Sequence, residues 1–300
     1  MPAGEVGGGC REDSKDIWEM TLSEEELLGV AFEAVAAAME AIMGIYRAGE
    51  DFGVVQKEDN TPVTRADMAS NRAIIGILER TGIPILSEET AHESYAVRRG
   101  YEWMWVVDPL DGTKEFIKRN DMFSVCIALV RGHRAVMGVI GVPVTGQVYY
   151  TRGGGAWRGV VGEGGSVGGE VRLPVTYGPV PHVVLGSVSH PGAATERVVA
   201  ALRGVEGWED TRLVAMGSSI KQCMIAEGSA AVYPRQGTTM EWDTAAGQAI
   251  VEASGGVLVR ASDGVGMLYN RARLRNPDFV AVAAGVGREV LEVARGAVRG

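Results

Sequence analysis

The chain has 300 residues, 46% of them hydrophobic and 22% charged, and its formal net charge at pH 7 is −9. A chain of this length and composition can form two lobes or one large layered domain with a substantial core. Nucleic-acid-binding proteins usually carry a basic stripe, so the negative charge argues against a nucleic-acid polymer as a partner.

The three cysteines, Cys10, Cys126 and Cys223, are far apart, and none belongs to a Cys-x-x-Cys pair. Cys126 and Cys223 lie in apolar runs, which predicts buried free thiols in a reducing compartment and no structural zinc site. Residues 1–20 contain a Gly-Gly-Gly run and lack the apolar stretch of a signal peptide, so we expect a flexible extension. These features favour a cytoplasmic protein.

The first helix is predicted near two overlapping capping boxes, Thr21-x-x-Glu24 and Ser23-x-x-Glu26. In the apolar stretch from Leu27 to Tyr46, charged residues recur every seven positions on one helical face. This pattern favours an amphipathic core helix over a transmembrane span. A second helix is expected from Thr64 to Arg80, because apolar residues recur there at helical spacing after a proline.

Strands are expected next. Ile83–Leu86 predicts a short strand that delivers Ser87-Glu88-Glu89, and Trp103–Val107 predicts a buried strand. An antiparallel meander is predicted further along the chain. Its three expected strands are Phe123–Val130, Ala135–Val144 and Gln147–Tyr150.

Residues 153–169 are rich in glycine, and we interpret them as a linker or as the exposed tip of a hairpin. In the second half of the chain, strands and helices alternate, which is typical of an α/β arrangement. The expected strands there are 183–185, 213–216 and 230–233, and the expected helices are 193–202, 217–227 and 244–254.

The hexamer Asp108-Pro109-Leu110-Asp111-Gly112-Thr113 directly follows the predicted strand Trp103–Val107. Its Pro and Gly predict a tight turn that presents two carboxylates at a strand end, where α/β proteins place ligands. Two aspartates three positions apart can share a pair of hard cations, with the carbonyl of Leu110 as a third oxygen ligand. The alternative is a surface turn in which both aspartates cap backbone amides.

Further acidic residues fall at similar places: Glu88 and Glu89 at a strand end, and Asp67 and Asp243 at helix starts. Each has a simpler structural explanation. Asp67 could complete a capping box with Thr64, Asp243 could be a helix N-cap, and the two glutamates could be solvated. Because all of them lie at strand ends or helix starts, we expect them at one edge of a layered fold.

All these candidate ligands are oxygen donors, which favours Mg²⁺ or Mn²⁺ over zinc. Without cations they would repel a phosphate ester, because two like charges ~4 Å apart cost about 4 kcal/mol at an effective dielectric near 20. With two or three divalent ions, the same pocket would act as an electrophilic clamp for in-line phosphoryl transfer to water.

Taken together, the motifs resemble the inositol-monophosphatase superfamily of lithium-sensitive phosphatases. The resemblance rests on Asp108–Thr113, on Trp242–Gly247, and on the segments from Lys57 to Asp67 and from Leu86 to Glu89, in the same order. Lys114-Glu115-Phe116-Ile117, Gly217-Ser218-Ser219-x-Lys221 and Tyr233-Pro234-Arg235 are most similar to the bacterial 3'(2'),5'-bisphosphate nucleotidases of CysQ type. The resemblance covers roughly residues 27–280.

The resemblance implies a layered αβαβα sandwich, with a metal-binding α+β part over residues 21–178 and an α/β part over residues 179–300. Its implied ligands for two or three Mg²⁺ or Mn²⁺ ions are Glu88, Asp108, the carbonyl of Leu110, Asp111 and Asp243. Its implied water-activating residues are Asp67 and Thr113, with Glu89 as the alternative base. Its implied substrate contacts are Glu88, Gly112, Thr113, Ser187, His190, Gly217, Lys221 and Asp243.

The implied substrate is adenosine 3',5'-bisphosphate, cleaved to AMP and phosphate by a monomer or homodimer, or its 5'-phosphosulfate form, which would place the enzyme in sulfur metabolism. An inositol monophosphatase or broad sugar phosphatase is the alternative, and Val188, where many relatives carry Arg, leaves it open. The Asp-x-x-Asp spacing disfavours a haloacid-dehalogenase-like phosphatase. Asp67 and Thr113 argue against a non-catalytic Mg²⁺- or nucleotide-binding regulator.

Overall fold

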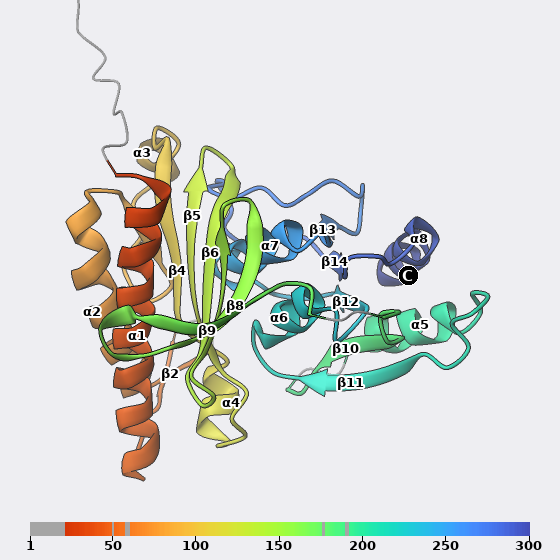
Figure 1. Ribbon diagram of the computed structural model, residues 1–300, viewed down its shortest axis with the longest axis horizontal. Helices are drawn as coiled ribbons and strands as arrows, with labels where there is room; N and C mark the ends of the chain where they lie inside the picture. The colour runs from red at the N-terminus through yellow and green to blue at the C-terminus, as the bar shows by residue number, and fades with distance from the viewer. Residues whose placement is uncertain (1–21, 50, 58–60, 176–177, 190–191) are drawn as a thin grey trace, which may run out of the picture.

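The computed structural model describes residues 22–49, 51–57, 61–175, 178–189 and 192–300. These residues form five layers in the order helix, sheet, helix, sheet, helix (Figure 1), which confirms the predicted αβαβα sandwich. The helices of the outer and middle layers are α1 (Glu24–Ala48), α2 (Arg65–Leu78), α6 (Ile220–Glu227), α7 (Ala245–Ala253), α5 (Ala193–Leu202) and α8 (Arg288–Arg299).

Helix α1 begins at the second of the two predicted capping boxes. The backbone N–H of Ser23 donates to the Glu26 carboxylate (2.7 Å), and the N–H of Glu26 donates to the Ser23 hydroxyl (3.2 Å). By length and composition alone the helix could cross a membrane. One face of the helix, however, is buried in the core beside α2 and the first sheet, as expected of an amphipathic core helix; its buried residues include Leu27, Val35 and Ile42.

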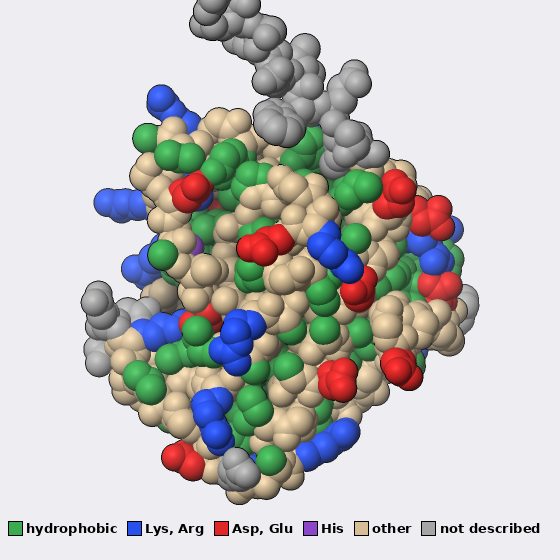
Figure 2. Space-filling model, turned by 90° about the vertical axis from the view of Figure 1, so that its left-hand side faces the viewer, with side chains coloured by type: hydrophobic (Ala, Val, Ile, Leu, Met, Phe, Trp, Pro, Cys, Tyr) green, Lys and Arg blue, Asp and Glu red, His purple; other side chains and the backbone are tan. Residues whose placement is uncertain are grey.

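Helix α2 begins at Thr64, as predicted, and its capping box pairs Thr64 with Asp67. It ends two residues earlier than expected, because the chain tightens into the 3₁₀ turn η1 (Glu79–Thr81). The helical layer formed by α1 and α2 faces the reader in Figure 2, where charged side chains of both signs are interspersed and form no basic stripe on this face.

The first sheet has seven strands in the order β3-β4-β5-β6-β7-β8-β9. Strands β3 and β4 are parallel and all other neighbours are antiparallel, so the predicted meander is confirmed. Its strands are β3 (Ile85–Ser87), β4 (Trp103–Asp111), β5 (Ser124–Arg131), β6 (Arg134–Val142), β7 (Gln147–Arg152), β8 (Gly155–Val161) and β9 (Val167–Arg172).

The interpretation of residues 153–169 as a linker or exposed tip was wrong, because this segment forms β8 and the start of β9. Two of its glycines permit a close approach of neighbouring segments. A Cβ on Gly159 would lie 2.5 Å from the Val167 side chain, and one on Gly165 would lie 2.6 Å from the backbone nitrogen of Glu33 in α1. The connection between β8 and β9 therefore packs against the first helix.

The predicted tight turn directly after Val107 was also wrong. Strand β4 continues to Asp111, with an irregularity in its pairing with β5 between Asp108 and Asp111. The chain turns only at Gly112, whose φ of 95° lies in the left-handed region that favours glycine, and the short helix α4 (Thr113–Ile117) follows. The two aspartates are thus held by a β-ladder.

The second sheet has five strands in the order β11-β10-β12-β14-β13. The three predicted strands and three predicted helices all form, and α5 has the predicted bounds. Sequence analysis did not predict α3 (Tyr95–Arg98), β13, β14 and α8. The sheet consists of β10 (Val183–Ser187), β11 (Arg212–Met216), β12 (Val232–Arg235), β13 (Val257–Arg260) and β14 (Phe279–Val282).

The core between the sheets contains buried residues of both, together with α6 and α7. Cys126 and Cys223 lie there as free thiols, as predicted. The first sheet ends before residue 178 and the second begins after it; the proposed division into two parts there stays a prediction. A small hairpin, β1 (Val55–Gln56) and β2 (Pro62–Val63), completes the fold.

Candidate active site

A cavity of about 210 Å³ lies where the end of β4, helix α4, the start of α6 and the turn before α7 meet. It brings together most of the residues singled out from the sequence. The predicted residues that line it are Glu88, Asp108, Leu110, Asp111, Gly112, Thr113, Ser187, Lys221 and Asp243.

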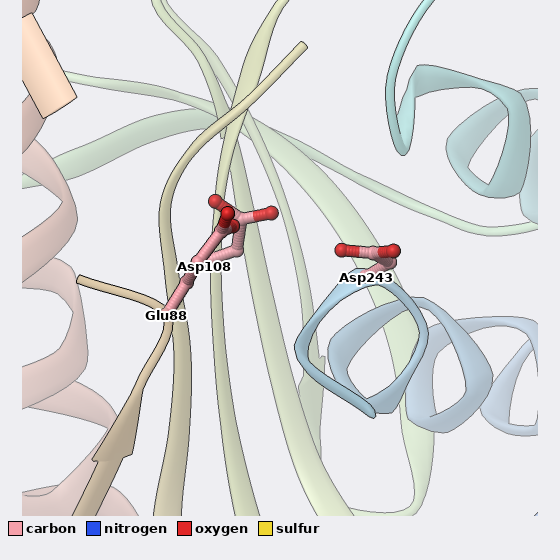
Figure 3. A group of neighbouring side chains, drawn as sticks. All are labelled: Glu88, Asp108 and Asp243. Atoms are coloured by element: carbon pink, nitrogen blue, oxygen red, sulfur yellow. The ribbon is translucent and has the colours of Figure 1, made fainter. Parts of the chain in front are cut away.

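Three carboxylates from separate parts of the chain converge at one side of this cavity. Glu88 follows β3, Asp108 lies in β4, and Asp243 ends the 3₁₀ turn η3 (Glu241–Asp243). One oxygen from each lies within 4.8 Å of the others. Figure 3 shows Glu88 and Asp108 next to each other, with Asp243 facing them from the turn before α7.

Burial and mutual repulsion make this cluster costly without a counter-charge. Burial raises the pKa of Asp108 well above its usual range, and the charges of Glu88, Asp111 and Asp243 raise it further. The pKa of Asp243 is raised in the same way by burial and by Asp111 and Glu88. The donors are all oxygens, and among the described residues only Glu88 of the three has an ion-pair partner, Lys57, so the residues fit a hard divalent metal ion.

Asp243 was predicted to open a helix, and here the structure differs. Asp243 is the last residue of η3, and its carboxylate accepts the N–H of Met240, the residue before the turn (2.8 Å). The N-cap of α7 is the next residue, Thr244. The short turn lifts Asp243 one residue clear of the helix, toward Asp108 and Glu88 (Figure 3).

Asp111 is bound from the other side of the cavity, by Ser219. Both the N–H and the hydroxyl of Ser219 donate to the same Asp111 oxygen, the N–H at 2.5 Å. Burial raises the pKa of Asp111, and these two hydrogen bonds lower it in part. From the sequence, Ser219 was quoted only within a motif and lay inside the helix predicted over 217–227; in the structure it is the N-cap of α6, which begins at Ile220.

Asp67 forms hydrogen bonds with both of its oxygens, to Thr64 on one side and to Thr113 on the other. One carboxylate oxygen accepts the N–H of Thr64 (2.7 Å) and its hydroxyl (2.5 Å), which completes the capping box. The other accepts the hydroxyl of Thr113 at 2.9 Å. Thr113 lines the cavity whereas Asp67 does not, so Asp67 acts on the cavity only through Thr113.

Glu89 lies apart from this pair. The amine of Lys57 donates to Glu89 (2.5 Å) and to Glu88 (2.8 Å), so the two glutamates share a cation, and Glu89 is not among the cavity-lining residues. Lys57, on the hairpin connection, is the partner that sequence analysis did not assign.

The predicted substrate contacts are divided. Ser187, at the end of β10, lines the cavity. Gly217 does not; a Cβ there would lie 2.6 Å from the Met122 carbonyl, so its observed role is close packing. His190 lies outside the described residues.

Lys221 lines the cavity, but its amine already donates to the carbonyls of Met216 (3.0 Å) and Ser218 (2.7 Å), and burial lowers its pKa to about 8. Arg235 and Thr239 also line the cavity. The Arg235 Nε and the Thr239 hydroxyl are buried without a hydrogen-bond partner among the described residues. Both residues of the cavity lining thus carry a donor that no described residue satisfies.

Comparison with known proteins shows which family this chain matches. The model of the inositol monophosphatase family matches residues 23–292. The 3'(2'),5'-bisphosphate nucleotidase CysQ of Escherichia coli K12 is 40% identical over 220 residues, which are 73% of this chain and 84% of that protein. The CysQ of Buchnera aphidicola is 36% identical over 233 residues, 77% and 83% of the two chains.

Among solved structures, CysQ from Bacteroides thetaiotaomicron, described as a bacterial member of the same family, superposes with a TM-score of 0.77. It is 41% identical, and the match covers 86% of this chain and 97% of that one. The family match spans almost all of the described residues, including Glu88, Asp108 and Asp243 of the carboxylate cluster. The chain belongs to the inositol monophosphatase family.

Proposed function

We propose that this chain is a metal-dependent 3'(2'),5'-bisphosphate nucleotidase that removes the 3'-phosphate of adenosine 3',5'-bisphosphate, yielding AMP and phosphate, and that also accepts the 5'-phosphosulfate form. The observation that carries the proposal is the position of the Glu88–Asp108–Asp243 cluster in a cavity whose lining also includes Arg235. The similarity of this chain to proteins named CysQ supports the choice of substrate.

Mg²⁺ is the proposed cofactor, in two or three sites, with Mn²⁺ as a substitute. Its proposed ligands are Glu88, Asp108, the carbonyl of Leu110, Asp111 and Asp243. Bound Mg²⁺ would neutralise phosphate charge and lower the pKa of water.

The other residues act through position and proton transfer. Asp67 holds the Thr113 hydroxyl at 2.9 Å, and we assign to this pair the orientation and deprotonation of the attacking water. Gly112 and Thr113 would contact the scissile phosphate, while Ser187, Lys221 and Arg235 would face the nucleotide. As water attacks, a new O–P bond forms, the bond from phosphorus to the ribose 3'-oxygen breaks, and that oxygen takes up a proton.

Chelation should abolish phosphate release from adenosine 3',5'-bisphosphate, and added Mg²⁺ should restore it. Li⁺ and excess Ca²⁺ should suppress the activity, because Ca²⁺ prefers longer and looser coordination than Mg²⁺ and would misplace the water. A colorimetric phosphate assay with and without EDTA tests this. Full activity in EDTA would contradict the metal mechanism.

Arg235→Ala should lower kcat/KM for adenosine 3',5'-bisphosphate about tenfold or more, because losing a charge-assisted hydrogen bond typically costs ~1.5–3 kcal/mol. The kcat/KM for inositol 1-phosphate should change little in this variant, because that substrate lacks the second phosphate. Lys221→Ala should impair both substrates, because its amine also holds two backbone carbonyls beside the site.

The same assay on the unaltered enzyme should include the 5'-phosphosulfate form, inositol 1-phosphate and fructose 1,6-bisphosphate. If inositol 1-phosphate is hydrolysed better than the nucleotide, the inositol monophosphatase alternative is correct, and Val188 is the first position to examine.

A further inference from the structure

The turn that carries Asp243 is held by a buried polar network centred on Glu241, two residues earlier. The Glu241 side chain is fully buried. One of its oxygens accepts the N–H of Asn270 (2.6 Å), and the other accepts the N–H (3.1 Å) and the Nε–H (2.9 Å) of Arg271. Three donors from the segment between α7 and β14 therefore meet one carboxylate.

Asn270 extends this network to the first sheet's side of the molecule. Its φ of 53° lies in the left-handed region, which asparagine tolerates better than most residues. Its amide donates to the carbonyl of Arg98 (2.8 Å), and its oxygen accepts from the Arg98 guanidinium (2.8 Å). Arg98 belongs to α3 and is itself buried.

A second set of bonds encloses the other end of the turn. The N–H of Glu241 donates to the carbonyl of Leu274 (2.9 Å). The amide of Asn276 donates to the carbonyl of Met240 (2.5 Å) and to the hydroxyl of Thr244 (3.0 Å). The residues immediately before and after η3 are thus fixed by the same segment that binds Glu241.

Neither Glu241 nor Asn270 nor Arg271 lines the cavity, so this network has no direct contact with a substrate. We infer that Glu241 is a positioning residue, which holds η3 so that the Asp243 carboxylate stays opposite Glu88 and Asp108. The inference rests on the proposed metal site and adds to it a residue outside the ligand set. Groups that hydrogen-bond directly to a metal ligand typically change metal affinity 10–100-fold when they are altered, and because Glu241 acts through the backbone of the turn we expect an effect near the lower end of that range.

Glu241→Gln tests the inference, because it keeps the shape but replaces one acceptor oxygen with an NH₂ group that faces existing donors. The matched control is Glu227→Gln. Glu227 is another shielded carboxylate, bound by Arg158 (2.5 Å) and Tyr149 (2.9 Å), but it lies at the far end of α6 from η3. Both variants should lower the thermal midpoint of the metal-free protein.

Two readouts separate positioning from a general loss of stability. Hydrogen exchange of the metal-free proteins should be faster across residues 240–247 in Glu241→Gln and unchanged there in Glu227→Gln. Calorimetric titration with Mn²⁺ should show at least tenfold weaker binding in Glu241→Gln and wild-type affinity in Glu227→Gln.

Unchanged exchange across residues 240–247, or equal loss of Mn²⁺ affinity in both variants, would overturn the role of Glu241. If the wild-type protein binds Mn²⁺ and Glu241→Gln binds it with the same affinity, the role of Glu241 would also be overturned, while the proposed metal site would remain. Absence of Mn²⁺ binding by the wild-type protein would instead overturn the metal site itself, and with it the inference.

Discussion

Asp108→Asn is expected to stabilise the metal-free protein and at the same time abolish its phosphatase activity. Asp108 is buried among carboxylates whose charges, together with burial, raise its pKa. Two like charges ~4 Å apart cost about 4 kcal/mol at an effective dielectric near 20, so removing one should increase the free energy of unfolding by about 1–3 kcal/mol. The Asn side-chain oxygen can still accept the Leu110 N–H that Asp108 binds at 3.0 Å.

The pH dependence follows from the same shift. Because the folded pKa of Asp108 is raised, the native metal-free protein binds more protons than the unfolded chain above pH 3.8, the ordinary value, and up to the raised one. The stability of the metal-free wild type should therefore fall as pH rises through that window, and Asp108→Asn should flatten the dependence. Thermal denaturation in EDTA at several pH values measures both effects.

With Mg²⁺ present the order should reverse. The wild type gains stability from the bound cation and the variant does not, and phosphate release by the variant should fall by at least about 10²–10³-fold, as when a group stabilising transition-state charge is lost. Glu227→Gln is the control, because Glu227 lies outside the cavity lining and pairs with Arg158 and Tyr149. A variant that is less stable than wild type in EDTA would show that no net repulsion exists at this site.

The carboxylate cluster was predictable because its residues lie in short motifs in which an acidic residue stands next to a recognisable strand end or helix start. Glu88 and Asp108 follow or belong to apolar strands, and such strands in a layered fold end at a shared edge. The capping box of Thr64 and Asp67 was visible for the same reason, since its bonds join residues three positions apart. What the motifs could not give was the backbone between Asp108 and Gly112, where pairing with β5 overrides the turn signal of Pro109.

The partners that tie distant segments together were beyond local patterns. Nothing near Glu241 indicates Asn270 or Arg271, and nothing near Asp111 indicates the Ser219 hydroxyl 108 positions away. The Gly-rich segment failed for a related reason. Glycine marks flexibility and close packing alike, and only the approach of Gly165 to the backbone of α1 distinguishes them.

Asp67→Asn is expected to lower kcat by about 10²–10⁴-fold, the usual contribution of general acid–base assistance, while Mn²⁺ affinity stays near that of wild type. The reason lies in the two oxygens of Asp67. The one that accepts the Thr64 N–H at 2.7 Å can be kept as the amide oxygen of Asn. The one that accepts the Thr113 hydroxyl at 2.9 Å then becomes NH₂, which donates and forces that hydroxyl to turn.

Thr64→Ala is the comparison variant, since it keeps the bond between Asp67 and Thr113 but removes the cap and the Thr64 hydroxyl that donates to the other Asp67 oxygen. It should reduce the free energy of unfolding by about 0.5–2 kcal/mol, as loss of an N-cap side chain does, with a much smaller fall in kcat than Asp67→Asn. Asp67→Asn should show the opposite pattern, because the Asn amide oxygen can still accept the Thr64 N–H that completes the capping box. Thr113→Ala should match Asp67→Asn in kcat, and the double variant should lose little more, because the two residues act as one unit. Wild-type turnover in Asp67→Asn would remove this residue from the chemistry and leave it only its cap, in which case Glu89 would be the next carboxylate to test.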